Sequence, residues 1–238
     1  MTATLLSQTG KITRQELQLV PVPPGTSTHR PLSHFEIVQA LLETLGFRRI
    51  EVVRDEYAVS HDGMRMFGVL DLELGITGVR FSIGIRNAND KSMRLAMCIG
   101  YRVLVCDNMA FHGDFTPVLA KHSKNFSLVD AVSVGVDRMQ RNFEPLAGHI
   151  EIVRHAPLTD DAAKLIIYQA FVEGSLEVPR HLARAVHENY FQPQHEEFAA
   201  RTAWSLSNAF TSSFKELDAV PQFRATAKLG PFLERSMQ

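Results

Sequence analysis

The chain has 238 residues, of which 45% are hydrophobic and 21% charged, and its formal net charge is −1. This composition is typical of a folded protein with a substantial core. No apolar run approaches the roughly 20 residues that span a bilayer, and the N-terminus lacks the basic start and apolar stretch of a secretion signal. We therefore expect a soluble, cytoplasmic protein with no membrane partner.

Residues 1–32 hold four prolines within QLVPVPPGTSTHRP and show no sustained periodicity. Such a segment is predicted to form an arm, or to run along the edge of the structure that follows. We expect one α+β domain over residues 33–238, with a helix and a sheet in 33–115 and mainly helices in 116–238. Its first helix is predicted over 33–45, because Ser33 and Glu36 form a capping-box pattern and Gly46 supplies a stop.

From Phe47 onward the hydrophobic period changes to two. The segments RRIEVVRDEYAVS and MRMFGVLDLEL, separated by HDG at 61–63, predict a hairpin, because Asp-Gly supplies the positive φ that tight turns need. VRFSIGIR, the turn NANDK and a long strand over 92–106 come next. The sequence thus predicts an antiparallel meander of four strands between about 48 and 106.

Helical patterns follow at 127–145, 160–173, 179–190 and 195–217. Pro179 suits a first helical turn, and Asp160 and Asp161 suit the positive end of a helix dipole. Strands first and helices second predict an α+β fold, in which helices cover one face of the sheet.

The strand over 92–106 alternates strictly between apolar residues and small or basic ones. Leu95, Met97, Ile99 and Val103 are predicted to lie on the core face. The opposite face of this strand and the same face of the preceding strand, VRFSIGIR, are predicted to carry four arginines separated by small residues. These are Arg80, Arg86, Arg94 and Arg102.

Residues 80–124 hold seven basic and three acidic side chains in an otherwise acidic chain. Arginine forks pair well with phosphates, so this region is a candidate nucleic-acid-binding surface. The alternative is that the arginines pair with carboxylates such as Asp71, Glu73 and Glu51. The candidate nucleic-acid-binding residues are Arg80, Arg86, Lys91, Arg94, Arg102, Lys121 and Lys124.

Two polar segments flank the long strand. Their candidate residues are Asn87, Asn89, Asp90, Asp107, Asn108, His112, Asp114 and His122. One alternative is a metal site built from Asp107, His112, Asp114 and His122, although their spacing matches no known ligand set. The other is turn chemistry, in which these side chains bond the local backbone. We expect no metal, no cofactor and no catalytic residue, because no common enzyme motif is present.

Cys98 and Cys106 are predicted to be free thiols. Eight residues of extended strand separate them by roughly 26 Å, which is too far for a disulfide.

The segments RNANDKSMRL, YRVLVCDNMAF, KHSKNF and TAWSLSNAFTSSFKE resemble an uncharacterised family of phage and plasmid-like proteins. The resemblance covers roughly residues 33–217. Its most specific parts include Arg86-Asn87, Asp90, Ser92 and Lys121-His122. The chain has Lys91 and Met109 where the resemblance implies glycine. The resemblance implies a mobile-element setting and no established activity.

We therefore expect a non-enzymatic accessory protein of a mobile element that binds DNA, single-stranded DNA included, through the basic face of its sheet. The helix and meander are also compatible with single-strand annealing proteins, which would make the protein a homo-oligomer. Two alternatives stay open. One is a metal-assisted hydrolase built on the polar loops after residue 106, and the other is a modulator that binds a host protein of defence or replication.

Overall fold

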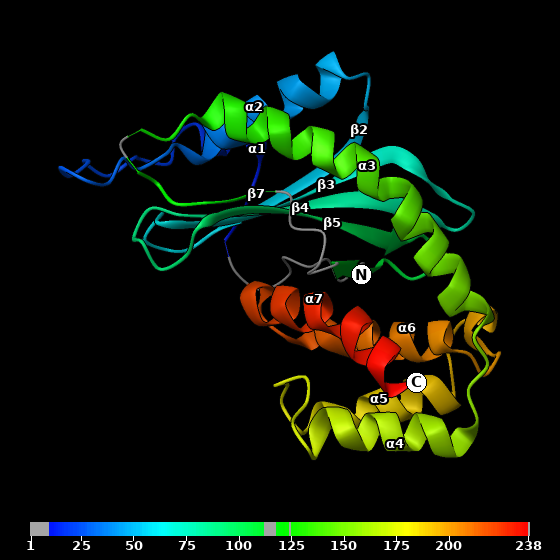
Figure 1. Cartoon of the computed structure of the whole chain (residues 1–238). Coiled ribbons are helices and arrows are strands. Elements are labelled where there is room, and N and C mark those ends of the chain that lie inside the picture. Colours follow the sequence, from blue (N-terminus) through cyan, green and yellow to red (C-terminus); the bar gives the residue numbers. More distant parts are fainter. Residues whose placement is uncertain (1–9, 112–117, 124, 238) are drawn as a thin grey trace. The chain divides into compact units, whose positions relative to one another are not determined.

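The computed structural model describes residues 10–111, 118–123 and 125–237 of the chain. It confirms the α+β class, with an antiparallel sheet and a helical C-terminal half (Figure 1). The chain divides into two compact units. We call residues 10–102, 118–123 and 125–143 the sheet unit, and residues 103–111 and 144–237 the helical unit. The single domain expected from residue 33 onward stays a prediction.

The four predicted strands are present and adjacent in chain order. They are β2 (Val52–Val59), β3 (Arg65–Ile76), β4 (Val79–Ala88) and β5 (Leu95–Val103). The turn between β2 and β3 is the predicted one, since Gly63 has a φ of 71°. This confirms the meander. Within the sheet unit, two short strands that were not predicted are added: β1 (Lys11–Ile12) pairs with β2, and β7 (Val118–Ala120) pairs with β5.

The proline-rich arm contributes β1 and the short helix α1 (Arg14–Leu17). Thr13 caps α1 reciprocally with Glu16, and Leu17 is fully buried. Of the described part of residues 1–32, β1 therefore lies at the β2 edge of the sheet.

The predicted first helix is α2 (His34–Phe47), and the Ser33 hydroxyl accepts a hydrogen bond from the Glu36 amide at its start. Its buried positions, Ile37, Val38, Leu41 and Leu45, lie on one face at helical spacing. Gly46 does not end the helix, which runs one residue past it. The chain reverses instead at Arg49, whose φ is 58°.

Helices α2 and α3 (Leu128–His155) cover one face of the sheet (Figure 1). The rings of Phe81 on β4 and Phe143 on α3 stack with centroids 5.3 Å apart. A Cβ atom on Gly135 would lie 2.4 Å from Val118 Cγ2, so α3 approaches β7 closely because position 135 is glycine. The prediction that α3 ends at 145 was wrong, since the helix continues through Pro145 to His155.

Strand β5 is buried along its whole length. Leu95, Met97, Ile99 and Val103 lie in the core, as predicted. Cys98 on the opposite face is also buried. Burial raises the pKa of the Cys98 thiol. The strand over 92–106 was predicted too long, since β5 ends at Val103 and Cys106 lies in the turn over 104–107. Both cysteines are nevertheless free thiols, as predicted.

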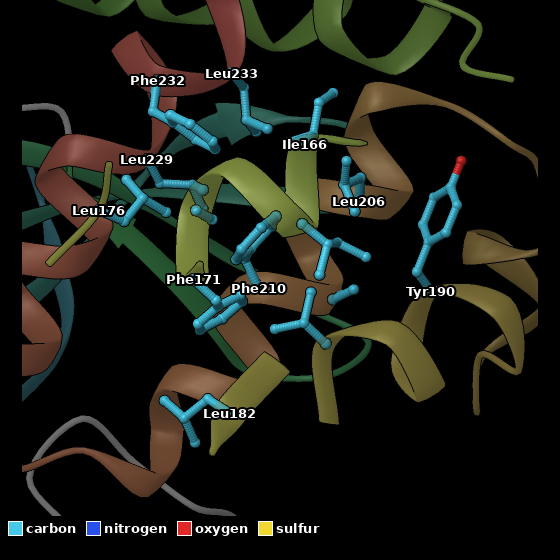
Figure 2. Packing of buried hydrophobic residues seen from close by; sticks show 14 of the residues in the cluster. Ile166, Phe171, Leu176, Leu182, Tyr190, Leu206, Phe210, Leu229, Phe232 and Leu233 are labelled. Atoms are coloured by element: carbon cyan, nitrogen blue, oxygen red, sulfur yellow. The ribbon is translucent and has the colours of Figure 1, made fainter. Parts of the chain in front are cut away.

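The helical unit holds β6 (Asn108–Phe111), α4 (Asp160–Phe171), α5 (Leu182–Phe191), η1 (Glu196–Phe198), α6 (Ala203–Ser213), η2 (Phe214–Glu216) and α7 (Ala219–Ser236). Side chains from α4, α5, α6 and α7 form one buried cluster around Phe171 and Phe210 (Figure 2). Helix α7 was not predicted, and the helix expected over 195–217 is split into η1, α6 and η2. No helix in the described ranges combines the length and apolar character needed to cross a membrane.

Candidate phosphate-binding pocket

A buried polar network holds the end of the N-terminal arm against the sheet unit. The side-chain amide of Asn89 accepts a hydrogen bond from the Leu32 amide and donates one to the Leu32 carbonyl, both at 3.0 Å. Asn87 Nδ2 donates to His34 Nδ1 at 2.9 Å, and His34 Nε2 donates to the Gly63 carbonyl at 2.9 Å. Burial lowers the pKa of His34, in keeping with a neutral ring that donates from one nitrogen and accepts at the other. Asn87 and Asn89 are therefore structural residues that fix residues 32–34.

Asn89→Ala is expected to lower the free energy of unfolding by about 1–3 kcal/mol, because it leaves both backbone groups of Leu32 without their buried partner. Asn125→Ala, which changes the same residue type at an exposed position, is the control and is expected to have almost no effect. Urea denaturation followed by circular dichroism measures both. Equal stabilities of the two variants would contradict this role for Asn89.

Beside the network lies a pocket of about 480 Å³. It brings together the arm, the β4–β5 turn and the segment after β7. Its lining residues are Thr28, His29, Ala88, Lys91, Ser92, Met93, Arg94, Lys121, His122 and Ser123. Three of these side chains are cationic and none is acidic. Lys91, Arg94 and Lys121, each predicted as a nucleic-acid contact, thus meet at one site.

Two histidines from distant parts of the chain form one wall of this pocket. The rings of His29 and His122 stack with centroids 5.5 Å apart and planes 9° apart. The His29 ring lies between two backbone carbonyls, with Nδ1 3.1 Å from the His122 oxygen and Nε2 3.2 Å from the Asn89 oxygen. A neutral ring donates to one of these oxygens, and a protonated ring donates to both. The backbone adds a bridge between His29 and Ser123. The wall is therefore ordered by backbone contacts.

His122 is only 6% exposed, and neither ring nitrogen has a hydrogen-bond partner among the described residues. Burial, helped by the nearby His29 and His34, lowers the pKa of His122 to about 4. The ring is therefore neutral at pH 7. Below about pH 6.5 the unfolded chain binds a proton that the folded ring takes up only near pH 4, so His122 reduces stability progressively across that interval.

The turn between β4 and β5 places Lys91 at the pocket. Asp90 accepts hydrogen bonds from the amide and the hydroxyl of Ser92, and its other carboxylate oxygen lies 3.7 Å from Arg65. Lys91 has a φ of 66°, the left-handed region that favours glycine. The resemblance implied glycine at this position, and the lysine keeps the same backbone geometry. Asp90 is thus a turn residue, and Lys91 supplies charge.

The predicted basic face of the sheet was wrong for Arg102, which is not a surface residue. This residue is 2% exposed, and its Nε donates to Asp71 Oδ2 at 2.7 Å. Ser82 Oγ donates to the other Asp71 oxygen at 2.6 Å, and Arg102 Nη2 lies 3.7 Å from Glu56. The alternative interpretation, pairing with carboxylates, is therefore right for Arg102.

The other arginines of the predicted face are also dispersed. Arg80 lies 3.6 Å from Glu73, as the carboxylate alternative expected, and Arg86 is half-buried. Arg94 precedes β5 and belongs to the pocket rather than to a strand face. The sheet therefore does not present four aligned arginines to solvent.

The second polar segment is divided between a turn and a buried contact. Asp107 has a φ of 54° in the turn before β6, a conformation that Asp tolerates better than most residues. Asn108 is buried in the helical unit, and its Nδ2 donates to the Asn208 carbonyl at 3.1 Å. Met109, where glycine was implied, is a buried residue of β6.

Three of the candidate site residues cannot be placed in either polar segment. His112, Asp114 and Lys124 lie outside the described residues. Across the residues that the structure does describe, no three His, Cys, Asp or Glu side chains are grouped so that they could hold a metal ion. The proposed ligands Asp107 and His122 belong to different units.

Sequence reasoning missed His29, Thr28, Ser92 and Ser123 as parts of the pocket. His29 lies in the proline-rich arm, where no periodicity predicts a partner, and its contact with His122 spans 93 residues. Of the residues that line the pocket, the local sequence singled out only the cations Lys91, Arg94 and Lys121 and the histidine His122.

A family model described as "Domain of unknown function (DUF932)" matches residues 28–228. That match spans all the lining residues of the pocket, the polar network and most of the helical cluster of Figure 2, whose Leu229, Phe232 and Leu233 lie beyond it. No curated protein and no solved structure matches the chain. Because the model covers well over half of its length, the chain belongs to the DUF932 family.

Proposed function

We propose that this protein binds single-stranded nucleic acid through the phosphate-binding pocket of the sheet unit. The observation that carries the proposal is the meeting of Lys91, Arg94 and Lys121 at a pocket of about 480 Å³ that has no carboxylate among its described lining residues. The neighbouring carboxylate of Asp90 is hydrogen-bonded to Ser92 and lies 3.7 Å from Arg65. The three cationic side chains therefore give the pocket a positive charge that attracts phosphate.

The shape of the pocket supports a single strand rather than a duplex. Its volume lies within the range of about 300–1,000 Å³ that holds a small organic ligand, which suits one nucleotide unit. The half-buried ring of His29, backed by the stacked ring of the buried His122, adds an aromatic face of the kind on which unpaired bases stack. Such a surface was lacking in the basic sheet face that the sequence predicted. A cytoplasmic role on a phage or plasmid would fit this chemistry.

Changing Arg94 and Lys121 together to Ala is expected to weaken binding and flatten its salt dependence. Each lost phosphate contact reduces the slope of log K against log[salt] by about 0.7 on single strands, so the double variant should lose about 1.4. Fluorescence anisotropy of a labelled single-stranded oligonucleotide across a salt series measures this slope. An unlabelled duplex of the same sequence is expected to compete poorly.

The matched control is Lys164→Ala with Arg184→Ala, which removes the same charge from exposed positions of the helical unit. Its salt slope is expected to equal that of the parent. Lys91→Gly adds a third test, because glycine accepts the φ of 66° and removes only the charge. Identical slopes for the parent and the pocket variant, or no binding at low salt, would refute the proposal.

A further inference from the structure

The helical unit contains a second, smaller pocket of about 140 Å³. It lies between the turn before β6, the segment after α5 and one side of α6. An apolar cavity of about 150 Å³ accommodates benzene, so this volume suits one six-membered ring and is too small for a whole nucleotide. The lining is mainly amide and hydroxyl side chains, and none of the described lining residues is acidic.

The hydrogen bonds of Asn108 fix which end of its side-chain amide is satisfied by the protein. Its Nδ2 donates to the Asn208 carbonyl at 3.1 Å and to Asn208 Oδ1 at 3.2 Å. Asn208 is oriented in turn, because its own Nδ2 donates to the Trp204 carbonyl at 3.0 Å. Turning the Asn108 amide around would place oxygen against two oxygens. Its Oδ1 is therefore the end left over, and it has no partner among the described residues.

Asn189 also lines the pocket and is half-buried. Its Nδ2 donates to Ser213 Oγ at 3.1 Å, which orients the amide and leaves its oxygen outside that hydrogen bond. Two amide oxygens in one small pocket favour a ligand that presents N–H donors, above all because the buried Oδ1 of Asn108 is costly to leave without a donor. The same lining offers no carboxylate to balance a positive charge, so an uncharged N–H donor fits better than an ammonium group.

One further wall of the pocket is aromatic. Phe198 is buried in the lining, and the His195 ring meets it edge-on with centroids 6.0 Å apart. A planar ring with N–H donors on its edge matches both the aromatic wall and the amide acceptors. Nucleobases combine these properties, and they are read in proteins by amide side chains and by stacking on aromatic rings.

We propose that this pocket binds a pyrimidine base, with cytosine preferred because its exocyclic amino group offers two N–H donors to the oxygens of Asn108 and Asn189. Purines are excluded by size. The base can come from a free nucleoside or from an unpaired position of a strand, and the chemistry of recognition is the same. This site is distinct from the phosphate-binding pocket and does not rest on the function proposed for it.

Isothermal titration of the full chain with cytidine, uridine and adenosine tests the proposal. A second arm uses an oligonucleotide with one deoxycytidine among abasic positions, compared with the fully abasic strand. Cytidine is expected to bind more tightly than uridine, and adenosine not at all. Tighter binding of the deoxycytidine strand than of the abasic strand, without binding of free cytidine, would assign the base to a strand.

Ser212→Leu fills the pocket from α6, and it should weaken cytidine or deoxycytidine binding at least tenfold. Ser175→Leu makes the same change at an exposed position of the helical unit and should leave binding unchanged. Circular dichroism confirms that both variants fold. The Arg94 and Lys121 double variant should keep its affinity for cytidine, which separates this proposal from the function above. Absence of a base preference in both arms, or equal binding by the two serine variants, would overturn it.

Discussion

Arg102→Met is expected to lower the free energy of unfolding by about 3–5 kcal/mol, because it leaves the Asp71 carboxylate charged and buried without its partner. Asp71 is 1% exposed, and Arg102 supplies the hydrogen bond at 2.7 Å to its Oδ2. Ser82 continues to donate to Oδ1, but a hydroxyl does not offset a full buried charge. Urea denaturation measures the loss.

Arg80→Met is the matched control for this experiment, since Arg80 and Glu73 form a pair 3.6 Å apart whose side chains are 34% and 58% exposed. Such pairs contribute about 0–1 kcal/mol, so this variant should remain close to the parent. Replacing both members of the buried pair, with Asp71→Leu added to Arg102→Met, should recover part of the loss because no lone charge is then buried. An Arg102→Met protein as stable as Arg80→Met would contradict the assignment of this pair as a buried structural contact.

Phe210→Ala is expected to cost about 3–5 kcal/mol in the helical unit, the range for removing a fully buried aromatic ring. Phe210 is fully buried, and its ring lies 5.8 Å from that of Phe171, 5.9 Å from Phe214 and 6.5 Å from Phe232, measured between centroids. Figure 2 shows it at the centre of the cluster. The fluorescence of Trp204, the only tryptophan of the chain, follows unfolding of this unit.

Phe47→Ala removes the same side chain from a position that is 88% exposed, and it should change stability little. If the chain unfolds as the single domain that its sequence predicts, the Arg102→Met variant of the sheet unit will also shift the Trp204 transition. A Phe210→Ala protein as stable as Phe47→Ala would show that the helical cluster of Figure 2 does not hold this unit together.

The sequence predicted best those features that depend on local hydrophobic periodicity and on turn residues. The alternation around Ile99 fixed which residues of β5 enter the core, and Asp62-Gly63 marked the hairpin turn correctly. The end of α3 was predicted wrongly because Pro145 reads as a stop, although a helix can accommodate a proline when its neighbours compensate for the missing N–H. The α7 pattern was obscured by Pro221 and Pro231.

The candidate site was predictable only in part, since its geometry depends on contacts between distant segments. Lys91, Arg94 and Lys121 were recognisable from their charge, but nothing local separates Arg94, at the pocket, from Arg102, which is buried beside Asp71. Asn89 was expected in a polar turn, whereas its amide binds the backbone of Leu32, 57 residues away. Alternation shows which residues share a strand face, and it does not show what lies opposite that face.

The burial of Cys98 gives the sheet unit an internal probe for chemical labelling. Cys98 is 1% exposed in β5, and burial raises the pKa of its thiol, so it is protonated and slow to react with iodoacetamide in the folded state. Cys106, in the helical unit, is only partly buried, so it is expected to react faster and serves as the reference thiol. The alkylation rate of Cys98, read by mass spectrometry in the chain with no substitution, therefore reports how often the sheet unit opens.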